Sequence, residues 1–157
     1  MNTKVWVVLL VVCITLVAGA ACITVMDNKE EAANIVENPL EGVILEIKEN
    51  TVSNTGLTLI INNVAPNNYA WGSDYLVEKA ISSSWEPVPD ILDGNYCWTS
   101  ELRILQGNSI TELEIDWGWL HGELSPGHYR VIKDFAYMMS EFTNGNYYPI
   151  PVEFTID

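Results

Sequence analysis

Short runs of alternating apolar and polar residues dominate the chain from residue 42 onward. In residues 43–47, the apolar residues Val43, Leu45 and Ile47 fall at every second position. Residues 112–117 alternate three acids with Leu113, Ile115 and Trp117. A period of two places all members of one set on the same face of a strand. The pattern therefore predicts strands with one face in a core and one face in water.

The same pattern predicts a set of evenly spaced strands with turn-rich segments between them. Pro87 and Pro89 confine one of these strands to the edge of a sheet, because proline cannot donate to a ladder. No helical period separates the strands, so we expect an all-β, antiparallel, immunoglobulin-like β-sandwich. The predicted strands are residues 42–49, 57–64, 75–81, 85–89, 96–105, 109–117, 127–137 and 150–156.

The N-terminal segment has a different character. Residues 5–26 are uncharged and apolar after a single base, Lys4. This run exceeds the roughly 18 residues that make a membrane span a candidate, and it also fits a secretory signal. We expect a signal peptide or anchor helix at residues 1–26, an acidic linker at 27–41 and the sandwich at 42–157. Lys4 on the inner side places the rest of the chain outside.

Three fates of the leader are compatible with its end. Gly19 to Cys22 resembles a bacterial lipoprotein cleavage box, in which Cys22 would be lipidated, although Gly19 stands where that box prefers a leucine-like residue. The run 18–20 fits an A-x-A cleavage site that would release the chain. An uncut helix would leave a single-pass protein. We expect export to the outer face of the cytoplasmic membrane, or secretion if residues 18–20 are cut.

Charge restricts the partners. The 157 residues include 21 acids and seven bases, which gives a net charge of −14. A chain of this sign is a poor ligand for nucleic acid, and no basic cluster attracts it to an anionic membrane. Membrane attachment therefore depends on the N-terminal lipid or helix. No phosphate-cradling glycine loop is present, and we expect no cofactor.

Cysteine usage excludes an internal disulfide in the predicted sandwich. Cys13 and Cys22 belong to the leader, so Cys97 is the single thiol of the sandwich. It stands between aromatic residues in the predicted strand 96–105. We expect a small buried thiol rather than a nucleophile.

Catalytic and metal chemistry find little support. Ser125, His121 and His128 are residue types of a hydrolase triad, but Ser125 lies in a Ser-Pro-Gly turn and no G-x-S-x-G elbow exists. Two histidines without a nearby thiolate are a weak metal signal. Residues 90–95 lack the spacing of a calcium loop. We expect neither an enzyme nor a metal site.

A turn at residues 124–129 has a specific interpretation. Pro126 and Gly127 supply a fixed φ and then a permissive one, as a tight turn requires. Tyr129 follows at the start of the next strand. That position fits a tyrosine corner, in which the hydroxyl bonds to the backbone just upstream.

Three segments carry a resemblance to a known family: "YAWGSDYLVEK" (69–79), "WEPVP" (85–89) and "DWGWLHGELSPGHYRVIKDF" (116–135). Over residues 42–157 the chain resembles the bacterial immunoglobulin-like domains of exported Gram-positive proteins. A short leader with one such domain is similar to small envelope lipoproteins or anchored proteins. The resemblance implies a fold and an export route, and it carries no catalytic residues.

Aromatic residues in the predicted loops are the candidate binding residues: Tyr69, Trp71, Tyr75, Tyr147 and Tyr148. Paired aromatics beside Asn and Gly are typical of binding loops. We expect a monomeric, non-enzymatic, envelope-tethered module that binds a protein or cell-wall ligand. The alternative is a structural or regulatory accessory, such as a sensor or an inhibitor of a secreted enzyme, that acts through an edge strand or a loop.

Overall fold

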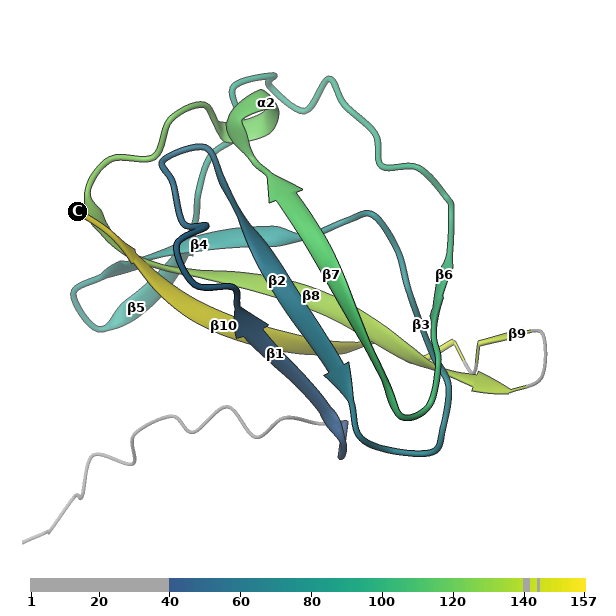
Figure 1. Cartoon of the computed structure of the whole chain (residues 1–157). Helices are drawn as coiled ribbons and strands as arrows, with labels where there is room; N and C mark the ends of the chain where they lie inside the picture. The colour runs from purple at the N-terminus through teal and green to yellow at the C-terminus, as the bar shows by residue number, and fades with distance from the viewer. Residues whose placement is uncertain (1–39, 140–141, 144) are drawn as a thin grey trace, which may run out of the picture. The chain divides into compact units, whose positions relative to one another are not determined.

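A computed structural model describes residues 40–139, 142–143 and 145–157, and these residues form an all-β structure with one short helix (Figure 1). The predicted leader helix and the linker up to residue 39 lie outside the described residues. The elements are β1 (Val43–Ile47), β2 (Gly56–Asn63), β3 (Tyr69–Trp71), β4 (Leu76–Ile81), β5 (Ser84–Pro87), β6 (Arg103–Leu105), β7 (Ser109–Asp116), α2 (Gly118–His121), β8 (Gly127–Met139), β9 (Phe142–Thr143) and β10 (Tyr148–Ile156).

The strands form two antiparallel sheets. The smaller sheet has the order β1-β2-β7. In the larger, seven-stranded sheet β8 is central: it pairs with β4, β3, β9 and β10, while β5 pairs with β4 and β6 pairs with β3. Residues 129–132 of β8 pair with both β4 and β10, so these two strands lie on opposite edges of β8. The arrangement is consistent with the predicted immunoglobulin-like sandwich.

The core lies between the inner faces of the two sheets. Leu57, Leu59 and Ile61 alternate inward along β2, and Tyr129 and Val131 do so along β8. Burying each such side chain fully stabilises the fold by about 1.5–3 kcal/mol. A disulfide is absent from this core, and apolar burial takes its place.

A stack of three aromatic rings joins the two sheets. Phe154 of β10 stacks on Trp117 at 5.2 Å and on Tyr129 at 5.6 Å between ring centroids. The indole of Trp117 also donates a hydrogen bond of 2.8 Å to the carbonyl of Asn54. The buried indole is thus fully satisfied, which is the condition for placing tryptophan in a core.

The connection from β7 to β8 contains the tyrosine corner. The hydroxyl of Tyr129 donates to the carbonyl of Ser125 at 2.7 Å. A Cβ at Gly127 would lie 2.9 Å from Cε of Lys79, so the end of this flexible side chain would have to move. Pro126 lies between Ser125 and Gly127, and its ring fixes the backbone φ angle at this position of the turn.

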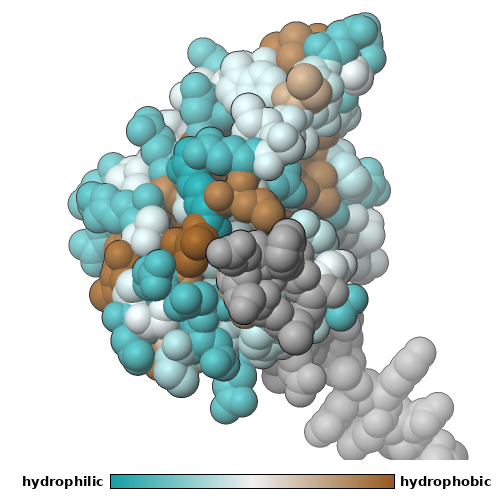
Figure 2. All heavy atoms as spheres, turned by 90° about the vertical axis from the view of Figure 1, so that its right-hand side faces the viewer, coloured by the Kyte–Doolittle hydropathy of each residue, from teal (hydrophilic) through white to brown (hydrophobic). Residues whose placement is uncertain are grey.

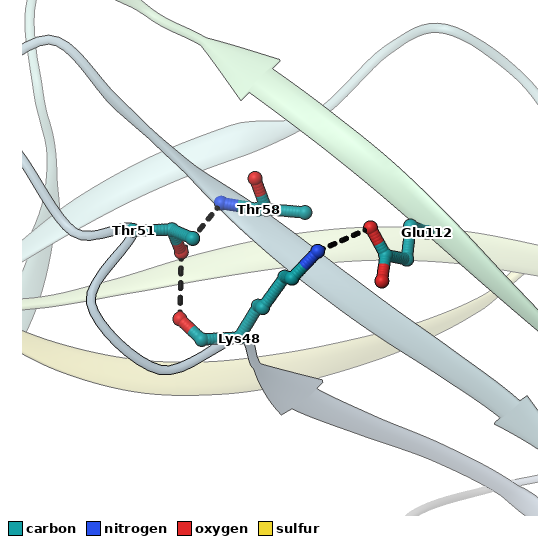
Figure 3. A network of polar contacts seen from close by, with 4 residues as sticks. All are labelled: Lys48, Thr51, Thr58 and Glu112. Atoms are coloured by element: carbon teal, nitrogen blue, oxygen red, sulfur yellow. Dashed lines mark hydrogen bonds and ion pairs between the residues drawn. The ribbon is translucent and has the colours of Figure 1, made fainter.

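A polar network closes the connection between β1 and β2 (Figure 3). Thr51 donates its hydroxyl to the carbonyl of Lys48 at 2.7 Å and accepts the backbone N–H of Thr58 at 3.1 Å. The ammonium of Lys48 reaches the carboxylate of Glu112 on β7 at 2.7 Å. Both charged side chains are about half exposed, so the ion pair contributes at most about 1 kcal/mol. The hydroxyl of Thr51 therefore does more than the ion pair to define this turn.

Three features of the strand prediction need correction. Residues 96–102 of the predicted strand 96–105 are not a strand, and only β6 remains. Strands β3 and β9 were not predicted. All three residues of β3 are buried, so its pattern does not alternate and resembles a short apolar run in a loop.

Among the described residues, no helix has the length and apolar character that crossing a membrane requires.

Candidate binding groove

Four aromatic side chains gather around the long loop that joins β5 to β6. Residues 88–102 form this loop and contain no strand or helix. Trp98 of the loop lies 4.8 Å from Tyr75, 5.5 Å from Trp119 and 6.0 Å from Tyr96, between ring centroids and in edge-to-face geometry. We call these four residues the aromatic cluster. Loops of this length without regular structure are uncommon and usually functional.

The loop is anchored to α2 and to the segment before β4. The backbone N–H of Ile91 donates to the carbonyl of Leu120 at 2.8 Å. The hydroxyls of Ser73 and Thr99 lie 2.8 Å apart, at hydrogen-bond distance. These bonds hold the loop at both of its ends, so that the aromatic cluster is held in a defined position.

A groove adjoins the aromatic cluster on the outer face of the larger sheet. Val131, Lys133 and Phe135 of β8 point inward and are buried, so Ile132 and Asp134 point outward. Leu76 pairs with Ile132, and Pro149 pairs with Asp134, which places four side chains of three strands on this face.

Two adjoining cavities of about 430 and 450 Å³ make up the groove, and they share three lining residues. The first is bounded by the end of the long loop, and the second by the aromatic cluster. The shared residues are Asp74, Asp134 and Tyr147. The other lining residues used below are Tyr75, Leu76, Trp98, Glu101, Leu102, Ile132 and Pro149.

The walls of the groove expose apolar surface. Tyr147 is 53% exposed, Leu102 is 51% exposed and Leu76 is 41% exposed. These side chains come from three separate segments of the chain. An exposed apolar surface with a few placed polar groups is the general form of a ligand pocket.

Two neighbouring carboxylates, Asp74 and Asp134, line both cavities of the groove, and the buried amine of Lys133 lies behind them. Burial raises the pKa of the Asp134 carboxyl, and the nearby charge of Asp74 raises it further, while Lys133 opposes both effects. The Lys133 side chain is wholly buried, and its ammonium donates to the backbone carbonyl of Asp74. Burial lowers the pKa of Lys133, although both carboxylates act in the opposite direction. Lys133 thus supports the groove from its inner side.

Tyr75 links the groove to the smaller sheet. Its hydroxyl donates to the carbonyl of Asp116, at the end of β7, at 2.7 Å. Burial raises the pKa of Tyr75 to about 12. The phenol is therefore neutral at physiological pH, and its hydroxyl is held by that bond.

Two of the predicted binding residues are core residues. Tyr69 is wholly buried and Trp71 is 3% exposed, because both belong to β3, which pairs with β6. Trp71 packs between the guanidinium of Arg103 at 5.2 Å and the ammonium of Lys133 at 5.5 Å. The prediction that Tyr69 and Trp71 lie on a binding loop is therefore wrong.

The remaining predicted residues lie in or near the groove. Tyr75 and Tyr147 line it. Tyr148, the first residue of β10, is half-buried and packs edge-on against Tyr137 at 5.8 Å. Their role in binding stays a prediction.

Several residues of the groove were not foreseen from the sequence. Trp98 was assigned to a strand, while Asp74 and Asp134 were not distinguished from the many other acids. The run "NYCW" (95–98) did carry a signal, since it places two aromatics directly after the turn at Asp93 and Gly94. The acids carried none, because the proximity of Asp74 and Asp134 depends on the register between β4 and β8.

Cys97 is exposed, so the prediction of a buried strand thiol is wrong. Its neighbours Tyr96 and Trp98 turn toward Trp119 and leave the thiol on the outer side of the loop. The rings of Tyr96 and Trp98 anchor this part of the loop, so the thiol between them does not have to be buried.

The side chains once considered for catalysis or metal binding have separate partners. His121 lies 2.9 Å from the carbonyl of Pro89, and His128 lies 3.0 Å from the carboxylate of Glu153. Ser125 accepts a hydrogen bond from the ammonium of Lys79. Within the described residues, no three His, Cys, Asp or Glu side chains gather as a metal site.

A family model described as "Bacterial Ig-like domain" matches residues 39–154. The chain belongs to the bacterial immunoglobulin-like domain family. Such domains are generally non-enzymatic, and they are typically extracellular or exposed at the cell surface. The predicted family is thereby confirmed, while its Gram-positive setting stays a prediction.

No curated protein matches this bacterial immunoglobulin-like domain. A solved structure titled "Crystal structure of protein from Archaeoglobus fulgidus" is similar over 75% of this chain and 98% of its own length. The two share 13% sequence identity, with a TM-score of 0.30.

Proposed function

We propose that this protein is a non-enzymatic binding module, tethered at the outer face of the cytoplasmic membrane, whose ligand occupies the groove. The groove itself carries the proposal. Each of its two cavities falls within the range of about 300–1,000 Å³ that is usual for ligand pockets. Its walls expose apolar side chains beside polar groups, an arrangement that often marks an interaction site.

The scaffold suits binding by a preformed site. Asp134 and Ile132 stand on the central strand of the larger sheet, and Tyr75 is held by its bond to Asp116. Leu76 and Pro149 also belong to strands, whereas the other lining residues lie in loops: Gly72, Asp74, Tyr75, Trp98, residues 99–102 and Tyr147. A rigid floor reduces the ordering cost of binding.

An accessory role through an edge strand is the second candidate. Strand β6 is the outer strand beside β3, and its Ile104 is 52% exposed. Figure 2, seen from the side on which β6 lies in Figure 1, shows hydrophobic residues in separate patches among hydrophilic ones. With only three residues, β6 offers a partner strand few backbone hydrogen bonds. The groove therefore has the stronger support.

Site-specific photocrosslinking in cells tests the proposal. The full-length chain receives benzoylphenylalanine either at Tyr147 in the groove or at Ile110, which is 68% exposed on the smaller sheet. We expect one dominant adduct from position 147 and none from position 110.

Adding Trp98→Ala should reduce that adduct by roughly fivefold, since stacking on an aromatic side chain contributes about 1 kcal/mol. Equal adducts at both positions, or an adduct insensitive to Trp98→Ala, would contradict a ligand site in the groove.

A further inference from the structure

We propose that the groove binds an extended peptide segment that presents a lysine or arginine side chain, with the aliphatic stem on the apolar walls and the cation at the carboxylates. This inference rests on the proposed function and names the chemical class of its ligand. The proposed ligand is a segment of a polypeptide partner, and the proposal involves no chemical reaction.

The walls and floor match the two ends of such a side chain. Lysine and arginine have apolar stems and a charged head, and they bury the stem while the head keeps polar contacts. Leu76, Ile132 and Pro149 supply apolar surface along the outer face of the sheet. Asp74 and Asp134 lie beside these residues in both cavities.

The outer face of the larger sheet shows why the groove attracts a cation. At the other end of this face the carboxylates have partners: Glu78 pairs with Arg130 at 2.6 Å, and Glu153 pairs with His128 at 3.0 Å. Among the described residues, no lysine or arginine forms an ion pair with Asp134 or Glu101. The groove is therefore the part of this face whose acids are not balanced by an exposed base.

Two bases near the groove do not fill this role. Lys133 lies 3.9 Å from Asp74 Oδ1, but its side chain is wholly buried on the inner side of the sheet. Arg103 stacks over Trp71 at 5.2 Å. Asp74 raises the pKa of Asp134 through repulsion, so a cation placed between the two carboxylates would relieve an existing cost.

The dimensions favour a peptide over a free small amine. The two cavities are contiguous through Asp74, Asp134 and Tyr147, so the groove extends beyond the space of one side chain. The remaining length can accept apolar neighbours on either side of the cation, against Leu102 at one end and Trp98 at the other. The net charge of −14 attracts a basic partner at long range.

Fluorescence anisotropy with a short labelled peptide of alternating leucine and lysine tests the inference on the full-length protein. The matched peptide carries acetyl-lysine, which keeps the stem and removes the charge. We expect the lysine peptide to bind at least about tenfold more tightly, and added salt to weaken it.

The variants Asp134→Asn and Glu101→Gln should each weaken binding of the lysine peptide by about tenfold. Asp93→Asn is the matched control, because it removes an exposed acid outside the groove at a backbone position with φ of 50°, which asparagine accepts. Thermal unfolding should show that all three variants fold like the wild type. Leu102→Ala, at an exposed wall position, should weaken binding without a change of charge.

Equal binding of the two peptides would show that the groove does not require a cation, and its ligand would then belong to another chemical class. If Asp93→Asn lost as much affinity for the lysine peptide as the two groove variants, the binding would reflect only general attraction by an acidic surface. Displacement by spermine at the same concentration as the peptide would replace a peptide ligand with a free polyamine. Absence of binding by every peptide would also overturn this inference, while the crosslink at position 147 tests the groove separately.

Discussion

Tyr129 connects three parts of the sandwich through a single side chain. Its hydroxyl bonds to the carbonyl of Ser125, and its ring stacks on Phe154. The ammonium of Lys79 lies 5.1 Å from the centroid of the same ring. The residue is 1% exposed, so each contact acts in a protected environment.

Tyr129→Phe removes the hydroxyl and keeps the ring. We expect the free energy of unfolding to fall by about 1 kcal/mol, because the carbonyl of Ser125 can turn to water while the aromatic stack persists. Urea unfolding followed by tryptophan fluorescence measures this change.

Tyr147→Phe is the control, since Tyr147 is half exposed and its loss of a hydroxyl should leave the stability unaltered. Equal stability of Tyr129→Phe and the wild type would show that the corner contributes nothing.

Sequence reasoning succeeded at residues whose role depends on near neighbours. Tyr129 and Pro126 lie within one turn, so their spacing alone specified the corner. Trp71 could not be placed in this way, because its burial depends on pairing with β6, more than thirty residues along the chain. The prediction for Cys97 was wrong for a related reason, because the rings beside it pack on Trp119 of a distant segment.

At the scale of elements, alternation predicted the long strands well and the short ones poorly. Strand β2 buries every second residue, and β10 does so over much of its length. Strand β7 alternates partly buried and exposed residues, with Ile115 fully buried. Strand β3 has only three residues, all buried, and its identity comes from its neighbours. The groove could not be predicted for the same reason, because the pairing of β8 with both β4 and β10 brings its acids and apolar residues together.

The long loop leads to a prediction about chemical reactivity. Cys97 is exposed on it, so a maleimide dye should label the folded protein without denaturant. We expect a labelling rate within about tenfold of the rate in urea, and Cys97→Ser should remove this component.

If the dye labelled the protein in urea but not without denaturant, the result would contradict an exposed thiol. The Cys97→Ser variant provides the baseline for any reaction at Cys13 or Cys22.

At the scale of the whole molecule, family and charge agree with a domain that works outside the cell. The family match covers residues 39–154, and the acidic composition keeps such a domain soluble. Composition could predict this much because it requires no knowledge of contacts. The proposed attachment to the membrane depends on residues 1–26, where the lipidation motif at Cys22 and the cleavage motif at 18–20 predict different products.

Radiolabelled palmitate distinguishes the three fates of the leader. We expect incorporation into the wild type that globomycin blocks and that Cys22→Ala abolishes, because lipidation requires the thiol of Cys22. Cys97→Ala should retain the label.

Membrane retention of an unlabelled chain would exclude the lipid and indicate the uncut helix. Recovery of the protein from the medium would indicate cleavage at 18–20.

The position of β8 in the chain has a consequence for the order of folding. This strand pairs with β3 and β4, which precede it by about fifty residues, and with β10, which follows it. Strand β4 cannot pair with β8 until residues 129–132 have emerged from the ribosome, and β3 cannot do so until residues 136–137 have emerged. Pairing across such separations is slow, and the incomplete chain keeps its apolar strands exposed for longer. We therefore expect the pairing of β8 to be a late step of folding, before which the emerging chain exposes the apolar surface that chaperones bind.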